Sequence, residues 1–168
     1  GSAILFRSAH QWNEDLYMVR YDGTGLFRLT RNPAVETDGA WSPLLPARLG
    51  VVRNPAVAFS SGRTGNYEIF LTNAEGSVHG QLTDDPASDR DPTWSPDGNT
   101  LAFASNRDES WEIYSISSNG TALTRLTDNN TLDRSPRWSP DGQRIAFWSF
   151  RDGDADIFLM NSDGTGEV

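Results

Sequence analysis

Three carboxylates in this 168-residue sequence stand at equivalent positions, each five residues before a tryptophan: Glu36, Asp89 and Asp133. Carboxylates that converge at the mouth of a channel attract a metal cation, an ammonium group or a basic peptide. Basic side chains recur with spacings of 53, 44 and 44 residues and could neutralise these carboxylates: His10, Arg63, Arg107 and Arg151. The pattern predicts a cation-binding mouth or a network of ion pairs between repeats, and both can hold in part.

Two tryptophans depart from this regular spacing and lie near the basic side chains. Trp12 and Trp111 could stack on a ligand such as a sugar ring or a peptide side chain, and Phe150 fits the same description. The alternative is that these rings pack at the edge of a sheet. We predict Trp12 and Trp111 as members of the binding site.

One acidic run resembles a calcium-binding loop. Asp152, Asp154 and Asp156 alternate, which places oxygen ligands at every second position. Such a loop has glycine at its sixth position, whereas Ile157 stands there in this sequence. Asp152 and Asp154 are therefore weak metal candidates. We expect no cofactor, with a cation such as calcium as the alternative.

Catalytic motifs are absent from the sequence. It has no Gly-x-Ser-x-Gly motif, no pair of metal-binding histidines and no glycine-rich phosphate loop, and its two histidines are His10 and His79. The lack of cysteine also removes thiolate zinc sites and cysteine nucleophiles. We therefore expect that the protein is not an enzyme.

The overall charge restricts the partners. The sequence has 23 Asp and Glu against 14 Lys and Arg, which gives a formal charge of −9 at pH 7. Nucleic acids and anionic membranes bind through clustered Lys and Arg, so we expect neither as a partner. No apolar run approaches the about 18 residues that a membrane-spanning helix needs, and the amino terminus has no basic and apolar leader.

The candidate residues are carried by an internal repeat. Four similar triplets recur with spacings of 53, 44 and 44 residues: Ile4-Leu5-Phe6, Val57-Ala58-Phe59, Leu101-Ala102-Phe103 and Ile145-Ala146-Phe147. Four-stranded units of about 40 to 45 residues are typical of β-propellers, in which each unit is one blade. We predict a single all-β domain over residues 1–168, with repeat units over about 3–34, 35–87, 88–131 and 132–168.

Short β-favouring runs, separated by Gly, Pro, Asn and Asp, indicate four strands in each unit. In the third unit they are predicted over Asp91–Trp94, Thr100–Ser105, Trp111–Ile116 and Leu123–Thr127, from the channel outward. Because neighbouring strands are antiparallel, the loops after the second strand share a face with the loops that lead into the next unit. The acids and the basic side chains lie on that face, and the Pro-Asp-Gly turns lie on the other.

The best preserved unit runs from Trp138-Ser139-Pro140-Asp141-Gly142, through Ile145-Ala146-Phe147 and Arg151-Asp152-Gly153, to Asp163-Gly164-Thr165-Gly166. This pattern resembles the repeat of TolB-type, WD-repeat-like β-propellers, and the resemblance spans nearly the whole chain. It implies a binding protein without catalytic activity in the periplasm or secreted from the cell. Similar proteins usually have six or more blades in one ring, and the related propellers of prolyl oligopeptidase-type enzymes are non-catalytic gates.

The strand count raises the question of ring closure. The sequence starts at a second strand and stops after a third strand, which gives 14 predicted strands in about four blades. Free strand edges and exposed apolar faces favour association. We expect closure by a second copy, as a homodimer with eight blades, or else a compact four-blade ring. The apolar insertion Leu44–Val52 could form a self-association surface or cover its own blade.

Together the patterns predict a TolB-like propeller module that binds a protein, a peptide or a small ligand at the channel mouth without catalysis. The predicted contacts are Glu36, Asp89, Asp133, His10, Arg63, Arg107, Arg151, Trp12 and Trp111. Two alternatives stay open: an architectural half-ring that assembles with itself, and a metal-dependent propeller enzyme.

Overall fold

Four antiparallel sheets, here called blades A to D, make up the computed structural model, which describes residues 3–10, 13–43 and 57–168. Blade A contains β1 (Ala3–His10), β2 (Asn13–Arg20) and β3 (Phe27–Arg28). Blade B contains β4 (Glu36–Trp41), β5 (Val57–Ser61), β6 (Glu68–Thr72) and β7 (Val78–Gln81). Blade C contains β8 (Asp89–Trp94), β9 (Thr100–Asp108), β10 (Ser110–Ser117) and β11 (Thr124–Arg125). Blade D contains β12 (Asp133–Trp138), β13 (Arg144–Ser149) and β14 (Asp156–Asn161).

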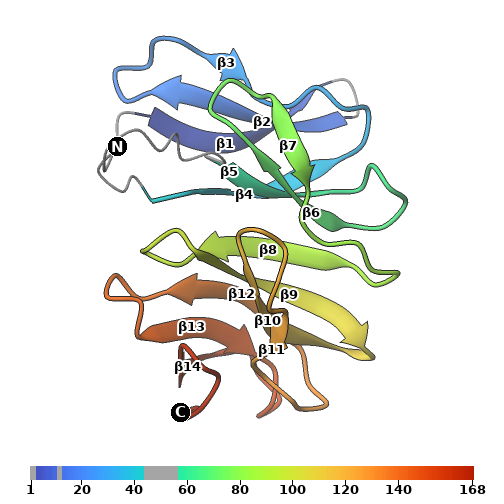
Figure 1. Cartoon of the computed structure of the whole chain (residues 1–168), viewed down its shortest axis with the longest axis vertical. Coiled ribbons are helices and arrows are strands. Elements are labelled where there is room, and N and C mark those ends of the chain that lie inside the picture. Colours follow the sequence, from blue (N-terminus) through green and yellow to red (C-terminus); the bar gives the residue numbers. More distant parts are fainter. Residues whose placement is uncertain (1–2, 11–12, 44–56) are drawn as a thin grey trace.

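The blades follow one another as an open arc (Figure 1). Blade B contacts blade A through β4, blade C contacts blade B through β8, and blade D contacts blade C through β12. The first strands of successive blades contact one another, so they lie on the inside of the arc. Across the described ranges, no strand of blade D contacts a strand of blade A. The all-β propeller prediction is confirmed, whereas the compact four-blade ring does not form.

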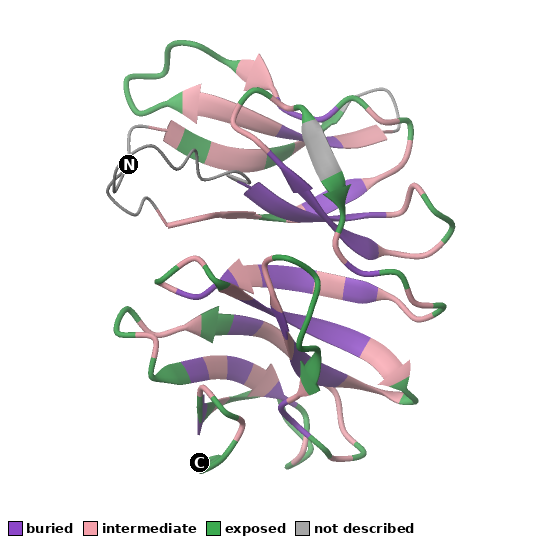
Figure 2. Ribbon diagram, viewed as in Figure 1, coloured by how far each residue is buried: buried purple, intermediate pink, exposed green. Residues whose placement is uncertain are grey.

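Each interface between blades holds its own apolar core. Phe59, Phe103 and Phe147 of the second strands are at most 1% exposed, and each lies about 6 Å from an aromatic ring of the third strand in its own blade. One cluster joins blades A and B, a second joins B and C, and a third joins C and D. Figure 2 shows the buried residues concentrated in the middle strands of the arc. The repeated β-branched and aromatic triplets therefore pack between blades.

A second repeated contact fixes the outer strand. In blade C the Thr127 hydroxyl donates to the buried Glu112 carboxylate at 2.6 Å and accepts a hydrogen bond from the Ile113 amide at 2.9 Å. The same arrangement occurs in two other blades: Asp15 with Thr30, and Glu68 with Thr83. In blade D the equivalent acid, Asp156, is exposed. The recurring Leu-Thr pairs thus serve structure, because their hydroxyl satisfies a buried carboxylate.

Among the described residues there is no helix with the length and apolar character that a membrane span requires.

Candidate functional site

The predicted mouth acids begin the innermost strands, and each one pairs with the arginine of its own blade. Arg107 donates to both carboxylate oxygens of Asp89 at 3.0 and 2.9 Å, and Arg151 donates to Asp133 at 3.1 Å. Arg63 pairs with Glu36 through one carboxylate oxygen, Oε1. All three acids are fully buried, whereas the arginine side chains are 14 to 21% exposed. The mouth acids are therefore neutralised locally, which a buried carboxylate requires.

Two further contacts hold each of these arginines. Its Nε atom donates to a serine at the end of the second strand, at 2.8 to 3.0 Å: Ser61, Ser105 and Ser149. Its guanidinium also lies over an aromatic ring of the third strand, 4.3 Å from the Phe70 and Phe158 centroids and 4.9 Å from the Tyr114 centroid. The expected ion pairs between repeats were wrong in this detail, since they form within each blade. In blade C, Arg107 lies in β9 because this strand is longer than predicted.

Burial shifts the pKa of one mouth acid, Glu36. Desolvation raises the pKa of the Glu36 carboxyl above its ordinary value of 4.5, and hydrogen bonding by Thr30 and the nearby Arg63 cation partly oppose that rise. Within its own blade, Glu36 accepts hydrogen bonds from Arg63 and from the Ser61 hydroxyl.

The innermost strands carry a bulge that the sequence repeat did not reveal. The pairing register shifts in β4, β8 and β12, and one non-glycine residue in each has a positive φ of 53 to 57°: Asp38, Asp91 and Ser135. Such backbone is uncommon for residues with a side chain and persists only where the surroundings enforce it. The bulge turns this position of each blade to the inside of the arc.

A groove of about 320 Å³ follows these bulges. Asp38, Trp41, Asp91, Trp94 and Arg137 are among its lining residues, so three blades contribute to it. It combines two carboxylates, one guanidinium and two indole rings. This composition suits a ligand with a cationic group and an apolar portion.

The two aspartates of the groove have different partners. Asp91 accepts hydrogen bonds from the Arg134 guanidinium at 2.9 Å and from the Ser135 hydroxyl and amide at 3.3 Å, which joins blades C and D. Asp38 accepts a hydrogen bond from the Thr37 hydroxyl at 2.8 Å. No Lys or Arg in the described part of the chain forms an ion pair with Asp38. Its counterpart in the next blade therefore binds a guanidinium, and Asp38 does not.

The blade sequence explains this difference. Arg90 stands where Arg134 stands one repeat later, and it lies 3.4 Å from the Tyr67 ring centroid. Arg134 lies 4.3 Å from the Trp111 ring centroid and still reaches Asp91. Asp91 also occupies the position at which blade D has Ser135, so the groove is lined by two carboxylates, Asp38 and Asp91. Arg90 therefore contacts an aromatic ring and forms no ion pair with Asp38 among the described residues.

The remaining predicted site residues have separate positions. Trp111 is half-buried against the core between blades C and D and is covered by Arg134. His10 ends β1, and Trp12 lies outside the described residues, as does the insertion Leu44–Val52. Asp152 and Asp154 are exposed, and the described part of the chain has no group of three metal-binding side chains. The metal loop therefore receives no support from the geometry.

Sequence reasoning missed the charged groove residues Asp38, Asp91 and Arg137, and also Arg134, which binds Asp91. A signal was present, because Asp38, Asp91 and Ser135 share the repeat spacings of 53 and 44 residues and lie two residues after each mouth acid. At this repeat position blades B and C have an aspartate, whereas blade D has Ser135, a hydroxyl side chain without charge.

Comparisons with known proteins agree with this architecture. The sequence matches the family described as TolB beta propeller domain over residues 54–127 and, in an overlapping match, over residues 92–167. The curated Protein TolB homolog of Chlorobium chlorochromatii (strain CaD3) is 30% identical over 134 residues, covering 60% of this chain and 30% of that protein.

Two solved structures have the same fold. A protein assigned as TolB from Agrobacterium tumefaciens has a TM-score of 0.85 at 22% identity, covering 100% of this chain and 60% of its own. TolB from Acinetobacter baumannii has a TM-score of 0.83 at 23% identity, covering 99% of this chain and 40% of its own. The chain thus spans 30 to 60% of the length of these three proteins.

Proposed function

Because this chain belongs to the TolB beta propeller domain family, we propose that it is a binding module without catalytic activity, and that it takes a cationic segment of a protein or peptide on the inside of the arc. A fold alone does not define a function, so the proposal rests on a site. That site is the groove along β4, β8 and β12. A periplasmic or secreted setting is part of the proposal and rests on the family.

The observation that carries the proposal is that the Asp38 carboxylate has no ion pair with Lys or Arg among the described residues. In the neighbouring interface, the equivalent carboxylate of Asp91 binds the Arg134 guanidinium at 2.9 Å. A lysine or arginine of a partner would form with Asp38 the ion pair that Arg134 forms with Asp91. The indole rings of Trp41 and Trp94 line the same groove and would pack against the aliphatic part of that side chain.

The mouth residues predicted from the sequence take a supporting role in this proposal. The pairs of Glu36 with Arg63, Asp89 with Arg107, and Asp133 with Arg151 keep the rim rigid, because each arginine is fixed by an acid, a serine and an aromatic ring. Exposed parts of the arginines and Trp111 then border the path of the bound segment. A preordered rim reduces the entropy lost on binding.

Binding of short peptides tests this function. The probes are peptides with a single lysine or arginine, compared with the same peptides carrying glutamine, and affinity is measured by calorimetry at low and moderate salt. We expect Asp38→Asn to weaken binding of the basic peptides by about tenfold. Asp152→Asn removes one exposed charge outside the groove and serves as the matched control. Equal affinity of wild type and Asp38→Asn would refute the proposal.

A second candidate function is self-assembly, and the free side of blade D favours it. Ile157 is 73% exposed and Phe150 is 47% exposed. β14 pairs with β13 on one edge, and among the described residues no strand pairs with its other edge, where Leu159 and Val168 exchange backbone hydrogen bonds. Open strand edges and apolar side chains pair readily with another sheet. A second copy of this chain would cover them. Light scattering over a dilution series tests this, with a mass of two chains in favour and a stable monomer against.

A further inference from the structure

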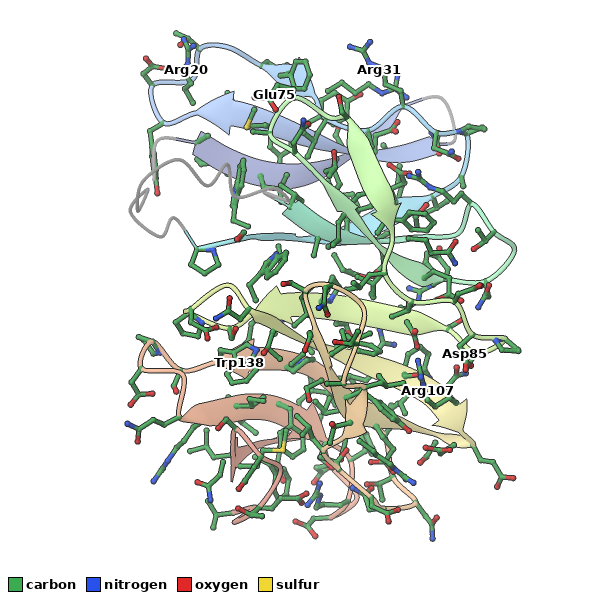
Figure 3. The ribbon with its side chains drawn as sticks, in the orientation of Figure 1. Arg20, Arg31, Glu75, Asp85, Arg107 and Trp138 are labelled. Atoms are coloured by element: carbon green, nitrogen blue, oxygen red, sulfur yellow. The ribbon has the colours of Figure 1, made fainter. Side chains whose placement is uncertain are left out.

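A second groove lies on the opposite side of the blades from the mouth. It has a volume of about 700 Å³ and opens between blades C and D, where the turns after β8, β10 and β12 meet. Figure 3 shows Trp138, which lines it, at the other side of the arc from the mouth residue Arg107. Small-ligand sites occupy about 300–1,000 Å³, so this groove has a suitable size.

Hydroxyl groups dominate the polar lining. Thr100, Ser115, Ser117 and Ser162 face the groove from blades C and D. None of these four hydroxyls forms a hydrogen bond to another residue in the described portion of the protein, whereas Ser95 nearby is used within its own turn. Four hydroxyls that can each donate and accept are therefore available to a ligand.

A carboxylate completes the set of acceptors. Asp141 is exposed, and its Oδ1 atom accepts from the Ser139 hydroxyl at 2.6 Å and from the Gln143 amide at 3.0 Å. These hydrogen bonds lower the pKa of Asp141, so it is ionised at neutral pH. Its Oδ2 atom has no hydrogen bond among the described residues and can accept from a ligand hydroxyl. The groove has no Lys, Arg or His among its described lining residues, which disfavours an anionic ligand.

An aromatic surface forms one wall. Trp138 is half-buried and packs against the core between blades C and D, which holds its ring in place. The two adjoining turns touch, since a Cβ atom on Gly142 would lie 3.4 Å from Pro96 Cδ, and Gly142 has a φ of +71°. Pro96 and Gly142 line the groove together with the indole ring.

We propose that the groove binds a neutral hexose unit. A sugar ring has an apolar C–H face that packs against an indole ring, and its hydroxyls both donate and accept, as the serines, the threonine and the carboxylate require. A peptide that adds a strand would instead need a free sheet edge, and no residue of the outermost strands β11 and β14 lines the groove. The proposed sugar site is independent of the groove on the inside of the arc that is proposed to take a cationic segment.

Saturation-transfer NMR with the whole chain tests the site, with glucose, galactose and N-acetylglucosamine as separate probes. We expect at least one hexose to receive saturation through its ring protons with a dissociation constant on the order of 1 mM. Glycerol provides hydroxyls without the C–H face and should give no comparable effect.

Two variants locate the binding. Ser117→Leu fills the groove, and we expect it to weaken hexose binding by at least about tenfold. Ser118→Leu adds the same side chain in the adjacent turn, outside the groove lining, and should bind as wild type does. Unfolding midpoints of both variants establish that they fold. The absence of any hexose signal, equal response to glycerol, or full binding by the folded Ser117→Leu variant would each overturn the proposal.

Discussion

Arg107 reaches back 18 residues along the chain to donate two hydrogen bonds to Asp89, and both residues belong to blade C. Asp89 is fully buried and Arg107 is 14% exposed. This ion pair at the rim of the arc therefore stabilises a single blade. Arg63 and Arg151 form the equivalent ion pair in blades B and D. The pair is therefore a structural feature of the repeat and is not specific to one ligand.

Removal of the arginine should destabilise the protein strongly. In the variant Arg107→Met the Asp89 carboxylate stays buried without its cation, so we expect the free energy of unfolding to fall by about 3 kcal/mol. Urea denaturation measures the change. The control is Arg7→Met, because the Arg7 side chain is 54% exposed in its pair with Glu14 and should change stability by about 0.5 kcal/mol. Equal losses in the two variants would contradict the structural role of the rim pair.

A pH-dependent effect is expected at Glu68. Burial raises the pKa of its carboxyl above the ordinary value of 4.5, while hydrogen bonds from Thr83, the Asp85 amide and Asn66 oppose the rise. In blade C an arginine, Arg125, lies 3.1 Å from the equivalent acid, but blade B has Gln81 at that position. A raised carboxyl pKa costs stability as the pH rises from the unfolded pKa through the folded pKa.

The variant Gln81→Arg should offset this cost. We expect about 0.5–1 kcal/mol of added stability at pH 7, which disappears below about pH 4.5, where Glu68 is protonated in both states. Denaturation curves over this pH range provide the measurement. The reverse change Arg125→Gln in blade C is the matched variant and should reduce stability at pH 7. A gain that is constant with pH would show that the added arginine acts elsewhere.

The hydroxyl of Thr127 should matter more than its volume. Thr127→Val keeps the shape but removes the donor to Glu112 at 2.6 Å and the acceptor for the Ile113 amide at 2.9 Å. Two buried polar groups lose a partner, so we expect a loss of about 2–4 kcal/mol in unfolding free energy. Thr121→Val, in an exposed turn, is the control and should have little effect. Comparable stability of the two variants would rule out this role for the hydroxyl.

Two glycines at equivalent turns should respond differently to alanine. Both have a positive φ, +84° for Gly120 and +85° for Gly164, so each substitution carries a backbone cost of about 1 kcal/mol. A Cβ atom on Gly164 would lie 2.6 Å from the Leu126 carbonyl oxygen of blade C, whereas on Gly120 the nearest atom is 3.8 Å away. We therefore expect Gly164→Ala to lower the thermal midpoint further than Gly120→Ala, and the reverse order would contradict this packing of blade D.

Much of the fold could be predicted from the repeat, because strand positions depend on local residue patterns. In blade C the predicted strand Thr100–Ser105 is observed as β9 over Thr100–Asp108, and Trp111–Ile116 as β10 over Ser110–Ser117. The predicted outer strand Leu123–Thr127 shortens to Thr124–Arg125, since its last residues turn toward the buried acid.

The site was less predictable for a physical reason. Acids and arginines that repeat with one period have the same spacing whether they pair within a blade or with the next blade. Spacing alone therefore cannot choose between Asp89 with Arg107 and a partner one repeat away. The bulge at Asp38 and Asp91 also has no residue signature, because aspartate tolerates positive φ without requiring it. Only the three-dimensional arrangement of β4 and β8 reveals that these carboxylates share a groove.

The open arc has a consequence for how the molecule comes apart. Blades B and C each pack against two neighbours, whereas blades A and D pack against one. When units are stabilised mainly through adjacent contacts, fraying starts at the ends and moves inward. Amide hydrogens of β1 and β14 should therefore exchange with solvent faster than those of β9.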